Sequence, residues 1–333
     1  MAHPDTWLRP RPEGLYCDPG GFFIDPVRAV DRAIITHAHS DHARAGHAAV
    51  LTRPETAALM QARLGKGRTA YQTLNWGQAL RLGDVTVWLQ PAGHVLGSGQ
   101  VAIEYRGQRV VVSGDYKRQP DRSCAGFVPI ACDLFITEAT FGLPIFRMPD
   151  PAAEIAKFTE SRALFPGRTH VIGCYSLGKT QRLICLLRDA GWDGPIYLQR
   201  ALMAMSAIYQ DFGIGLGVLH PLETASVAEL AGAIVLAPPN IQGADWAGRL
   251  TDPVACLASG WMLGGKRALQ SGAELPLAIS DHADWNGLLQ TIAEVGAPEV
   301  WVTHGREAAL IHALGTCGVK GRALRLVSYQ DLG

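Results

Sequence analysis

Six of the eleven histidines lie in four short polar clusters, and the densest cluster holds four potential metal ligands within six residues. Its ligands are His37, His39, Asp41 and His42. Side chains so close in sequence can converge on one point from a turn, whereas a regular helix or strand points them in several directions. Imidazole nitrogens and carboxylate oxygens suit Zn²⁺ or Mn²⁺. The pattern therefore predicts a metal site rather than a polar loop in which Asp41 caps a helix.

Two later segments offer further ligands for such a site. His94 stands in the sequence GHVLGS, and Asp115 follows three consecutive valines in the sequence VVVSGDY. A glycine-histidine pair alone is a weak signal, and it gains weight from the first cluster. A carboxylate at the edge of a buried sheet is costly without a partner, and metal ions would remove that cost. We therefore expect His94 and Asp115 to complete the site.

Three more polar residues each follow an apolar run that reads as a strand. They are Glu138 in ITEAT, His282 in SDHAD and His304 in THGRE. The runs before them, like Arg109–Ser113 and Leu134–Thr137, are typical of buried strands. Functional side chains at the C-terminal ends of strands are common in α/β proteins. The elements thus predict one site at the edge of a sheet.

A proline-rich stretch near residue 141, FGLPIFRMPDP, interrupts this pattern of strands. The residues after it alternate between helical and strand patterns, as in a small α/β domain: a helix over Ala152–Leu164, a strand over His170–Tyr175 and a helix over Gly178–Ala190. Near Val254 the chain returns to strands that end in polar clusters. We therefore predict a first domain of residues 1–145 and 256–333, interrupted by a cap domain of residues 146–255.

In this order, the H-x-H-x-D-H, G-H and S-G-D motifs resemble those of the metallo-β-lactamase superfamily. The later acid and histidines, and the domain inserted between Glu138 and His282, resemble the β-CASP group of nucleic-acid-processing enzymes. The segments GLYCDPGG and DRAIITHAHSDHARAGH are similar to bacterial ligase-associated DNA damage response exonucleases. The resemblance implies an αββα sandwich with an inserted α/β cap, and a DNA exonuclease active in DNA repair.

The resemblance also implies two divalent metal ions per chain, zinc or manganese, and a role for each ligand. One ion would be bound by His37, His39 and His94, the other by Asp41, His42 and His304, and Asp115 would bridge them. A hydroxide between two such ions can attack a phosphodiester bond at neutral pH. His282 would act as general acid, oriented by Glu138.

Two further assignments concern residues around the ligands. The acid ahead of the first motif would orient a ligand histidine, and Asp25 is preferred to Asp18 because it ends an apolar triplet. In the inserted domain, a helix that begins near Gly178 offers backbone N–H groups to an anion. Ser176, Lys179 and Arg182 are suited to binding a phosphate there, although they would also fit an ordinary capped helix.

Other functions stay open at this stage. In the β-CASP group a histidine at the position of His304 is associated with RNA enzymes, so RNA is the alternative substrate. A lactonase or thioesterase would share the first motifs but not Glu138, His282 and the cap. A non-catalytic scaffold is disfavoured because every ligand position is filled.

Composition limits the partners and the compartment. The formal net charge is zero, so contact with nucleic acid must be local rather than through a broadly basic surface. Seven scattered cysteines without a C-x-x-C motif argue against a disulfide framework. Neither an N-terminal signal nor a run of 18 apolar residues is visible, so we expect a cytoplasmic protein without membrane contact. The family resemblance implies association with a DNA ligase and a helicase.

Overall fold

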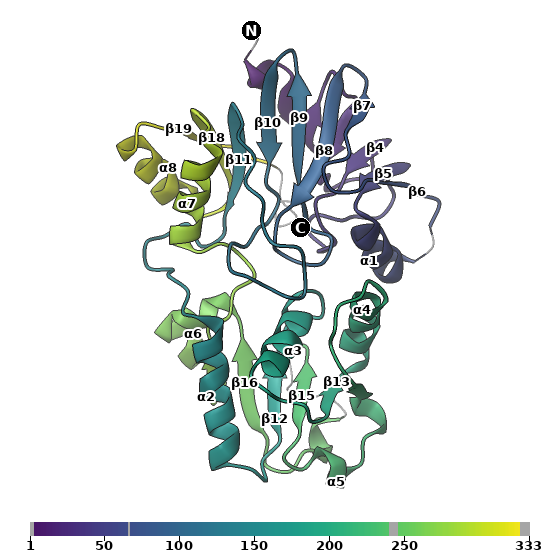
Figure 1. Cartoon of the computed structure of the whole chain (residues 1–333), viewed down its shortest axis with the longest axis vertical. Helices are drawn as coiled ribbons and strands as arrows, with labels where there is room; N and C mark the ends of the chain where they lie inside the picture. The colour runs from purple at the N-terminus through teal and green to yellow at the C-terminus, as the bar shows by residue number, and fades with distance from the viewer. Residues whose placement is uncertain (1–2, 66, 240–245, 327–333) are drawn as a thin grey trace. The chain divides into compact units, whose positions relative to one another are not determined.

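The computed structural model describes residues 3–65, 67–239 and 246–326, and the chain divides into two compact units (Figure 1). The first unit contains the described residues within 1–120, 124–147 and 282–333. The second contains residues 121–123 and the described part of 148–281. In the sequence, the larger part of the second unit is therefore inserted between two parts of the first.

Two mixed sheets form the first unit. The strands of one sheet, in spatial order, are β1 (Leu8–Arg11), β2 (Gly14–Cys17), β3 (Phe22–Ile24), β4 (Arg32–Ile34), β5 (Ala49–Thr52) and β6 (Ala70–Thr73). The strands of the other, in spatial order, are β19 (Lys320–Ala323), β18 (Glu299–Gly305), β11 (Leu134–Ala139), β10 (Gln108–Val112), β9 (Gly99–Tyr105), β8 (Val85–Pro91) and β7 (Leu80–Leu82). One apolar core joins the inner faces of both sheets, including Phe22, Ile34, Val87 and Trp301.

Helices cover the outer faces of this sandwich. A second apolar cluster packs α7 (Trp285–Val295) and α8 (Glu307–Thr316) against the second sheet, where Figure 1 shows them beside β11 and β18. The α1 helix (Pro54–Leu64) contacts β6 of the first sheet. Strand β11 is buried along its whole length because Ile136 faces the inner core and Phe135 faces the helices. The layers are thus helix, sheet, sheet and helix.

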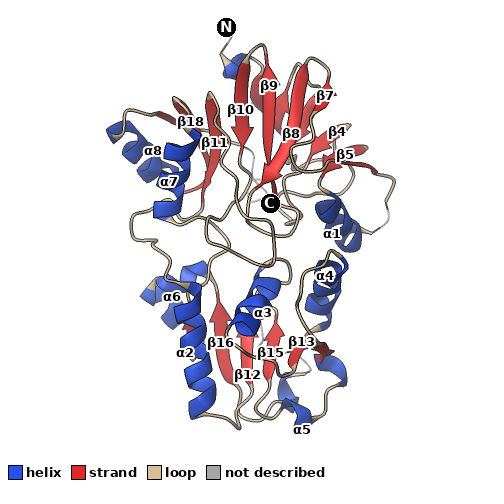
Figure 2. Cartoon of the chain, viewed as in Figure 1, coloured by secondary structure: helices blue, strands red, loops and turns tan. Residues whose placement is uncertain are grey.

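The second unit is built on one parallel sheet (Figure 2). Its strands, in spatial order, are β14 (Leu219–Pro221), β13 (Ile196–Leu198), β15 (Ile234–Ala237), β12 (His170–Gly173), β16 (Val254–Ala258) and β17 (Leu275–Leu277). Its α-helices are α2 (Pro151–Leu164), α3 (Lys179–Asp189), α4 (Arg200–Asp211), α5 (Val227–Leu230) and α6 (Gly265–Gln270). Parallel strands need crossover connections, which explains the alternation of strands and helices.

The end of the inserted unit differs from the prediction. We expected the chain to return to the first domain at residue 256, but the inserted unit extends to Asp281. The reason is strand pairing: β16 lies parallel to β12, and β17 lies parallel to β16, so both extend the inserted sheet. The start of the insertion, at Met148, lies within three residues of the predicted boundary.

Several predicted elements agree closely with the structure. The α2 helix begins at Pro151 with Asp150 as its cap, whose carboxylate accepts a hydrogen bond from the Ala152 N–H at 3.0 Å. The buried and half-buried residues of β8 alternate along the strand, as they do where one face of a strand packs on the core. Among the described residues, no helix combines the length and the apolar character needed to cross a membrane.

Candidate metal centre

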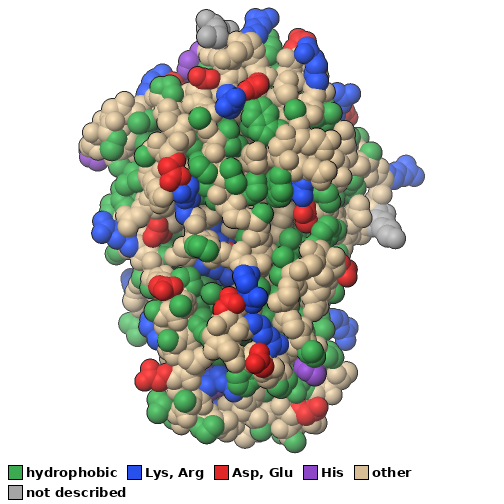
Figure 3. Space-filling model, in the orientation of Figure 1, with side chains coloured by type: hydrophobic (Ala, Val, Ile, Leu, Met, Phe, Trp, Pro, Cys, Tyr) green, Lys and Arg blue, Asp and Glu red, His purple; other side chains and the backbone are tan. Residues whose placement is uncertain are grey.

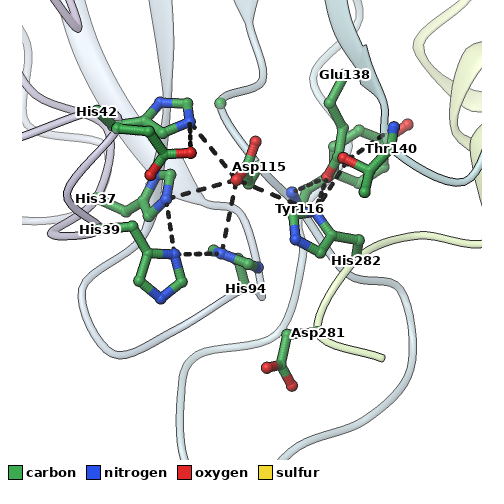
Figure 4. A network of polar contacts seen from close by, with 12 residues as sticks. His37, His39, His42, His94, Asp115, Tyr116, Glu138, Thr140, Asp281 and His282 are labelled. Carbon is green, nitrogen blue, oxygen red and sulfur yellow. Dashed lines mark hydrogen bonds and ion pairs between the residues drawn. The ribbon is translucent and has the colours of Figure 1, made fainter. Parts of the chain in front are cut away.

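The predicted ligands come from loops and strand ends of the first unit. His37 to His42 lie in the loop after β4, His94 lies in the turn between β8 and β9, and Asp115 follows β10. Strands β10, β11 and β18 are mutually parallel neighbours, so their C-terminal ends lie at one edge of the sheet. Figure 4 shows the side chains from these segments converging around Asp115.

Three histidines and Asp115 form a compact group of donor atoms. His39 Nδ1 lies 3.1 Å from His37 Nε2 and 3.0 Å from His94 Nε2. Asp115 Oδ2 lies 3.6 Å from His37 Nε2 and 3.8 Å from His94 Nε2. A tetrahedral ion with bonds of about 2 Å separates its ligands by roughly 3.3 Å. These four residues, whose donor atoms all lie within 4.8 Å of one another, therefore fit a divalent metal ion.

The second predicted ligand group lies next to the first, with the rings of His42 and His37 4.2 Å apart between centroids, and it is more open. His42 Nε2 lies 3.6 Å from Asp115 Oδ2 and 3.9 Å from Asp41 Oδ2. The ring of His304 lies 5.4 Å from the ring of His42, measured between centroids. Asp41 is largely exposed, with 64% of its side chain accessible. The donor types fit a second ion, and Asp115 Oδ2 approaches histidines of both groups.

His304 adopts an unusual backbone conformation at the end of β18. Its φ angle is +52°, in the left-handed region that only a few per cent of residues other than glycine occupy, histidine among the more frequent of them. The next residue, Gly305, has a φ of +124°, and a Cβ atom there would lie 2.1 Å from the Ala139 carbonyl oxygen. Close packing of Gly305 against Ala139 thus fixes the turn that carries His304. Such outliers are often retained at functional sites.

Asp25 contacts the ring nitrogen of His42 that faces away from Asp115. Its Oδ2 atom lies 2.7 Å from His42 Nδ1, and its carboxylate accepts hydrogen bonds from the Thr36 backbone N–H at 2.8 Å and the Thr36 hydroxyl at 2.6 Å. A carboxylate on one ring nitrogen orients the other nitrogen toward a metal. The rival residue, Asp18, instead pairs at the surface with Arg9 and Arg11. Asp25 therefore has the geometry expected of the orienting acid.

Glu138 and His282 form a separate pair beside Asp115. His282 Nδ1 lies 2.9 and 3.0 Å from the two carboxylate oxygens of Glu138 and 4.0 Å from Asp115 Oδ2. Glu138 is buried, and it also accepts a hydrogen bond from the Tyr116 backbone N–H at 2.8 Å. The His282 ring keeps 23% of its surface exposed. This arrangement can hold a partly accessible imidazole at a fixed place next to the metal ligands.

Burial and mutual charge set the protonation of the cluster. Burial lowers the pKa of His37 well below its ordinary value, and the neighbouring His42 lowers it further. Burial also lowers the pKa of His42, but the Asp115 and Asp25 carboxylates outweigh it and raise that pKa to about 10. Burial favours protonation of Asp115, yet the surrounding histidines, His42 first, hold its pKa well below the usual range. Asp115 is thus an ionised carboxylate among imidazoles.

The predicted phosphate-binding residues lie in the second unit, around the start of α3. Ser176 is half-buried, whereas Lys179 and Arg182 are buried and make ion pairs with Asp281 at 3.0 and 3.3 Å. The two cations are therefore not exposed phosphate ligands, because the chain itself supplies their anion. Sequence reasoning missed Asp281, although the SDHAD motif contains it, and it missed Thr36, which stands directly before His37.

Comparisons with known proteins agree with this geometry. A family model described as the metallo-beta-lactamase superfamily matches residues 25–165. The chain is 32% identical, over 96% of its length, to a protein of Opitutus terrae named "Probable DNA ligase", of which it covers 31%. It is 22% identical, over 90% of its length, to cleavage and polyadenylation specificity factor subunit 3-I of Arabidopsis thaliana, of which it covers 55%.

A third relative is "Probable RNase MJ4" of Methanocaldococcus jannaschii, 24% identical over 60% of this chain and 54% of that protein. The chain thus spans between about a third and about half the length of these curated relatives. A solved structure of a protein of unknown function from Enterococcus faecalis V583 has a TM-score of 0.59 at 16% identity. It covers 88% of this chain and 79% of that one, and at this identity the likeness concerns the fold alone.

Proposed function

We propose that the chain is a metal-dependent nuclease of the β-CASP group, specifically a DNA exonuclease active in DNA repair, because a metallo-beta-lactamase family model matches residues 25–165 and nearly the whole chain is similar to a protein named as a probable DNA ligase. The observation that carries the hydrolytic part is the convergence of four histidines on the buried Asp115, with the His282–Glu138 pair beside them. The DNA part rests on the match of nearly the whole chain to a protein named as a probable DNA ligase.

Two divalent ions, zinc or manganese, would supply an activated water as nucleophile and neutralise charge on the phosphate. The residues that would hold one ion are His37, His39, His94 and Asp115. The residues that would hold the other are Asp41, His42, His304 and the shared Asp115. Asp25 would keep His42 in the orientation that ligation requires.

His282 would give a proton to the leaving oxygen of the cleaved strand. An alkoxide is a poor leaving group, and a positioned general acid accelerates such a step by about 10²- to 10⁴-fold. Glu138 would hold the imidazole so that the proton is presented at a fixed place, and the Tyr116 backbone N–H in turn holds Glu138. Since Nδ1 faces Glu138, Nε2 is the ring nitrogen left to carry the donated proton, and the ring itself lies beside Asp115, with Nδ1 4.0 Å from Asp115 Oδ2.

Binding of the nucleic acid would depend on the site rather than on the general surface. Basic and acidic side chains are interspersed on the face shown in Figure 3, and the formal net charge is zero. We therefore expect weak non-specific binding with a modest salt dependence. Association with a DNA ligase and a helicase, and a cytoplasmic location, remain part of the proposal.

The test is digestion of end-labelled single-stranded DNA, double-stranded DNA and RNA of the same sequence, with Zn²⁺ and with Mn²⁺. Wild type should shorten DNA from an end, and Asp115→Ala should be inactive. His282→Ala should retain the metal but cleave at least about 10²-fold more slowly. Cleavage by Asp115→Ala at the wild-type rate would contradict the proposal.

An RNA nuclease is the second candidate. The relative from Methanocaldococcus jannaschii is named as a probable RNase, and the relative from Arabidopsis thaliana is named for cleavage and polyadenylation. In addition, residue 304 is a histidine, which in the β-CASP group is associated with RNA enzymes. The same digestion distinguishes the two functions. RNA cleaved much faster than DNA under both metals would replace the DNA assignment and leave the metal centre and its mechanism unchanged.

A further inference from the structure

The second unit contains a buried cluster of opposite charges at the start of α3. Asp281 accepts Lys179 Nζ on Oδ2 at 3.0 Å and Arg182 Nη1 on Oδ1 at 3.3 Å. Asp121 lies 3.6 Å from Arg182 Nε, which adds a second carboxylate to the cluster. Lys179 and Arg182 are 3% and 1% exposed, so these pairs are shielded from solvent.

The same two cations also bind the backbone of the segment that contains Asp281. Lys179 Nζ donates a hydrogen bond to the Ile279 carbonyl at 2.5 Å, and Arg182 Nη1 donates to the Ser280 carbonyl. Three consecutive residues, 279 to 281, are therefore attached to the first turn of α3. The chain leaves the second unit directly after this segment, and the next residue is His282.

This arrangement is electrostatically demanding. The N-terminus of a helix disfavours cations, and both basic residues lie in the first turn of α3. Burial makes an uncompensated charge more costly still. The carboxylate of Asp281 therefore compensates both buried cations, and this pairing holds the main chain of residues 279 to 281.

We propose that Asp281 is a positioning residue for His282: by binding Lys179 and Arg182, it fixes the backbone from which the proton donor projects. Glu138 restrains the imidazole ring, whereas Asp281 restrains the main chain one residue earlier. This inference rests on the proposed function, in which His282 protonates the leaving group.

The test uses two substrates that differ in their need for an acid. One is a DNA oligonucleotide, whose alkoxide leaving group must be protonated, and the other is bis(p-nitrophenyl) phosphate, whose leaving group departs without a proton. Asp281→Asn should lower kcat on DNA by about 10²-fold with little change in KM, and stay within a few-fold of wild type on the p-nitrophenyl ester. His282→Ala should show the same selectivity.

The matched control is Arg188→Gln, on the same helix. Arg188 Nη1 donates to the Trp192 and Gly194 carbonyls at 2.7 Å, so its loss disturbs the second unit away from residues 279 to 281. This variant should treat both substrates like wild type. If Asp281→Asn does not fold, Lys179→Gln replaces it, because Arg182 still pairs with Asp281 there, and it should show the same selectivity in weaker form.

Equal loss on both substrates, or wild-type activity on DNA, in the deciding variant would overturn the inference. Wild-type protein that cleaves neither substrate with Zn²⁺ or Mn²⁺ would instead overturn the proposed function, and the inference with it. Activity of wild type on both substrates, with selective loss in the variant, supports both.

Discussion

The imidazole of His282 is held by the buried carboxylate of Glu138, with Nδ1 at 2.9 and 3.0 Å from its two oxygens. These residues are 144 positions apart in the chain, and the inserted unit lies between them. A charge-assisted contact of this kind fixes both the orientation and the proton arrangement of the ring.

Glu138→Gln should lower kcat on DNA by about 10- to 100-fold while KM stays nearly constant, because it removes an interaction needed for proton transfer rather than for binding. Steady-state kinetics on an oligonucleotide measures it. Adding the substitution to His282→Ala should cost little more, since the two residues act as one unit. Independent, multiplicative losses in the double variant would separate their roles.

Asp25→Asn should weaken metal binding by about 10- to 100-fold, because the carboxylate that orients His42 is lost. Titration of the metal-free protein with Zn²⁺, followed by calorimetry, measures the affinity. Excess metal should restore most of the activity. Asp18→Asn is the matched control, since Asp18 pairs with two surface arginines, and its affinity should equal that of wild type.

Removal of metal should lower thermal stability as well as activity. The fold brings four imidazoles together around the buried carboxylate of Asp115, and ions that bind only this folded arrangement stabilise it by mass action. Dialysis against a chelator should lower Tm, and Zn²⁺ should restore it. In Asp115→Ala the same addition should raise Tm much less. An equal rise in both proteins would place the stabilising ion elsewhere.

Glu299 predicts an acid-dependent loss of stability away from the site. Burial raises its pKa, but hydrogen bonds from Trp301 Nε1 at 2.6 Å and Lys320 Nζ at 2.9 Å outweigh it and lower the pKa to about 2. Because the folded-state pKa lies below the ordinary value of 4.5, this stabilisation is complete above about pH 4.5. It is lost as the pH falls from there toward about 2.

Glu299→Gln should therefore lower the free energy of unfolding at pH 7 by on the order of 1–2 kcal/mol and make its decline between pH 5 and 2 shallower. Urea unfolding at several pH values measures both effects. Asp84→Asn, at a carboxylate that is 74% exposed, serves as control and should leave the curve unchanged. If the free energy of unfolding of Glu299→Gln declined with falling pH as steeply as that of wild type, Glu299 would not be the group responsible.

Much of the candidate site could be predicted because its chemistry is local in the sequence. The ligands from His37 to His42 share one turn, and Asp115 and Glu138 come at the ends of apolar runs that could only be buried strands. A strand pattern and a polar residue at its end are properties of a few consecutive residues. The sequence patterns by themselves thus determined the residue types and the strand-end positions, and the family resemblance implied the sandwich with an insertion.

The tertiary structure decided what depends on partners distant in the chain. The inserted unit ends at Asp281 because β16 pairs with β12 and β17 pairs with β16. No local pattern reveals which sheet a short strand joins. Lys179 and Arg182 read as phosphate ligands because their spacing suits a helix N-terminus. Only the fold shows that a carboxylate about 100 residues later already neutralises them. A side chain's type is written in the sequence, but the charge it meets is set by packing.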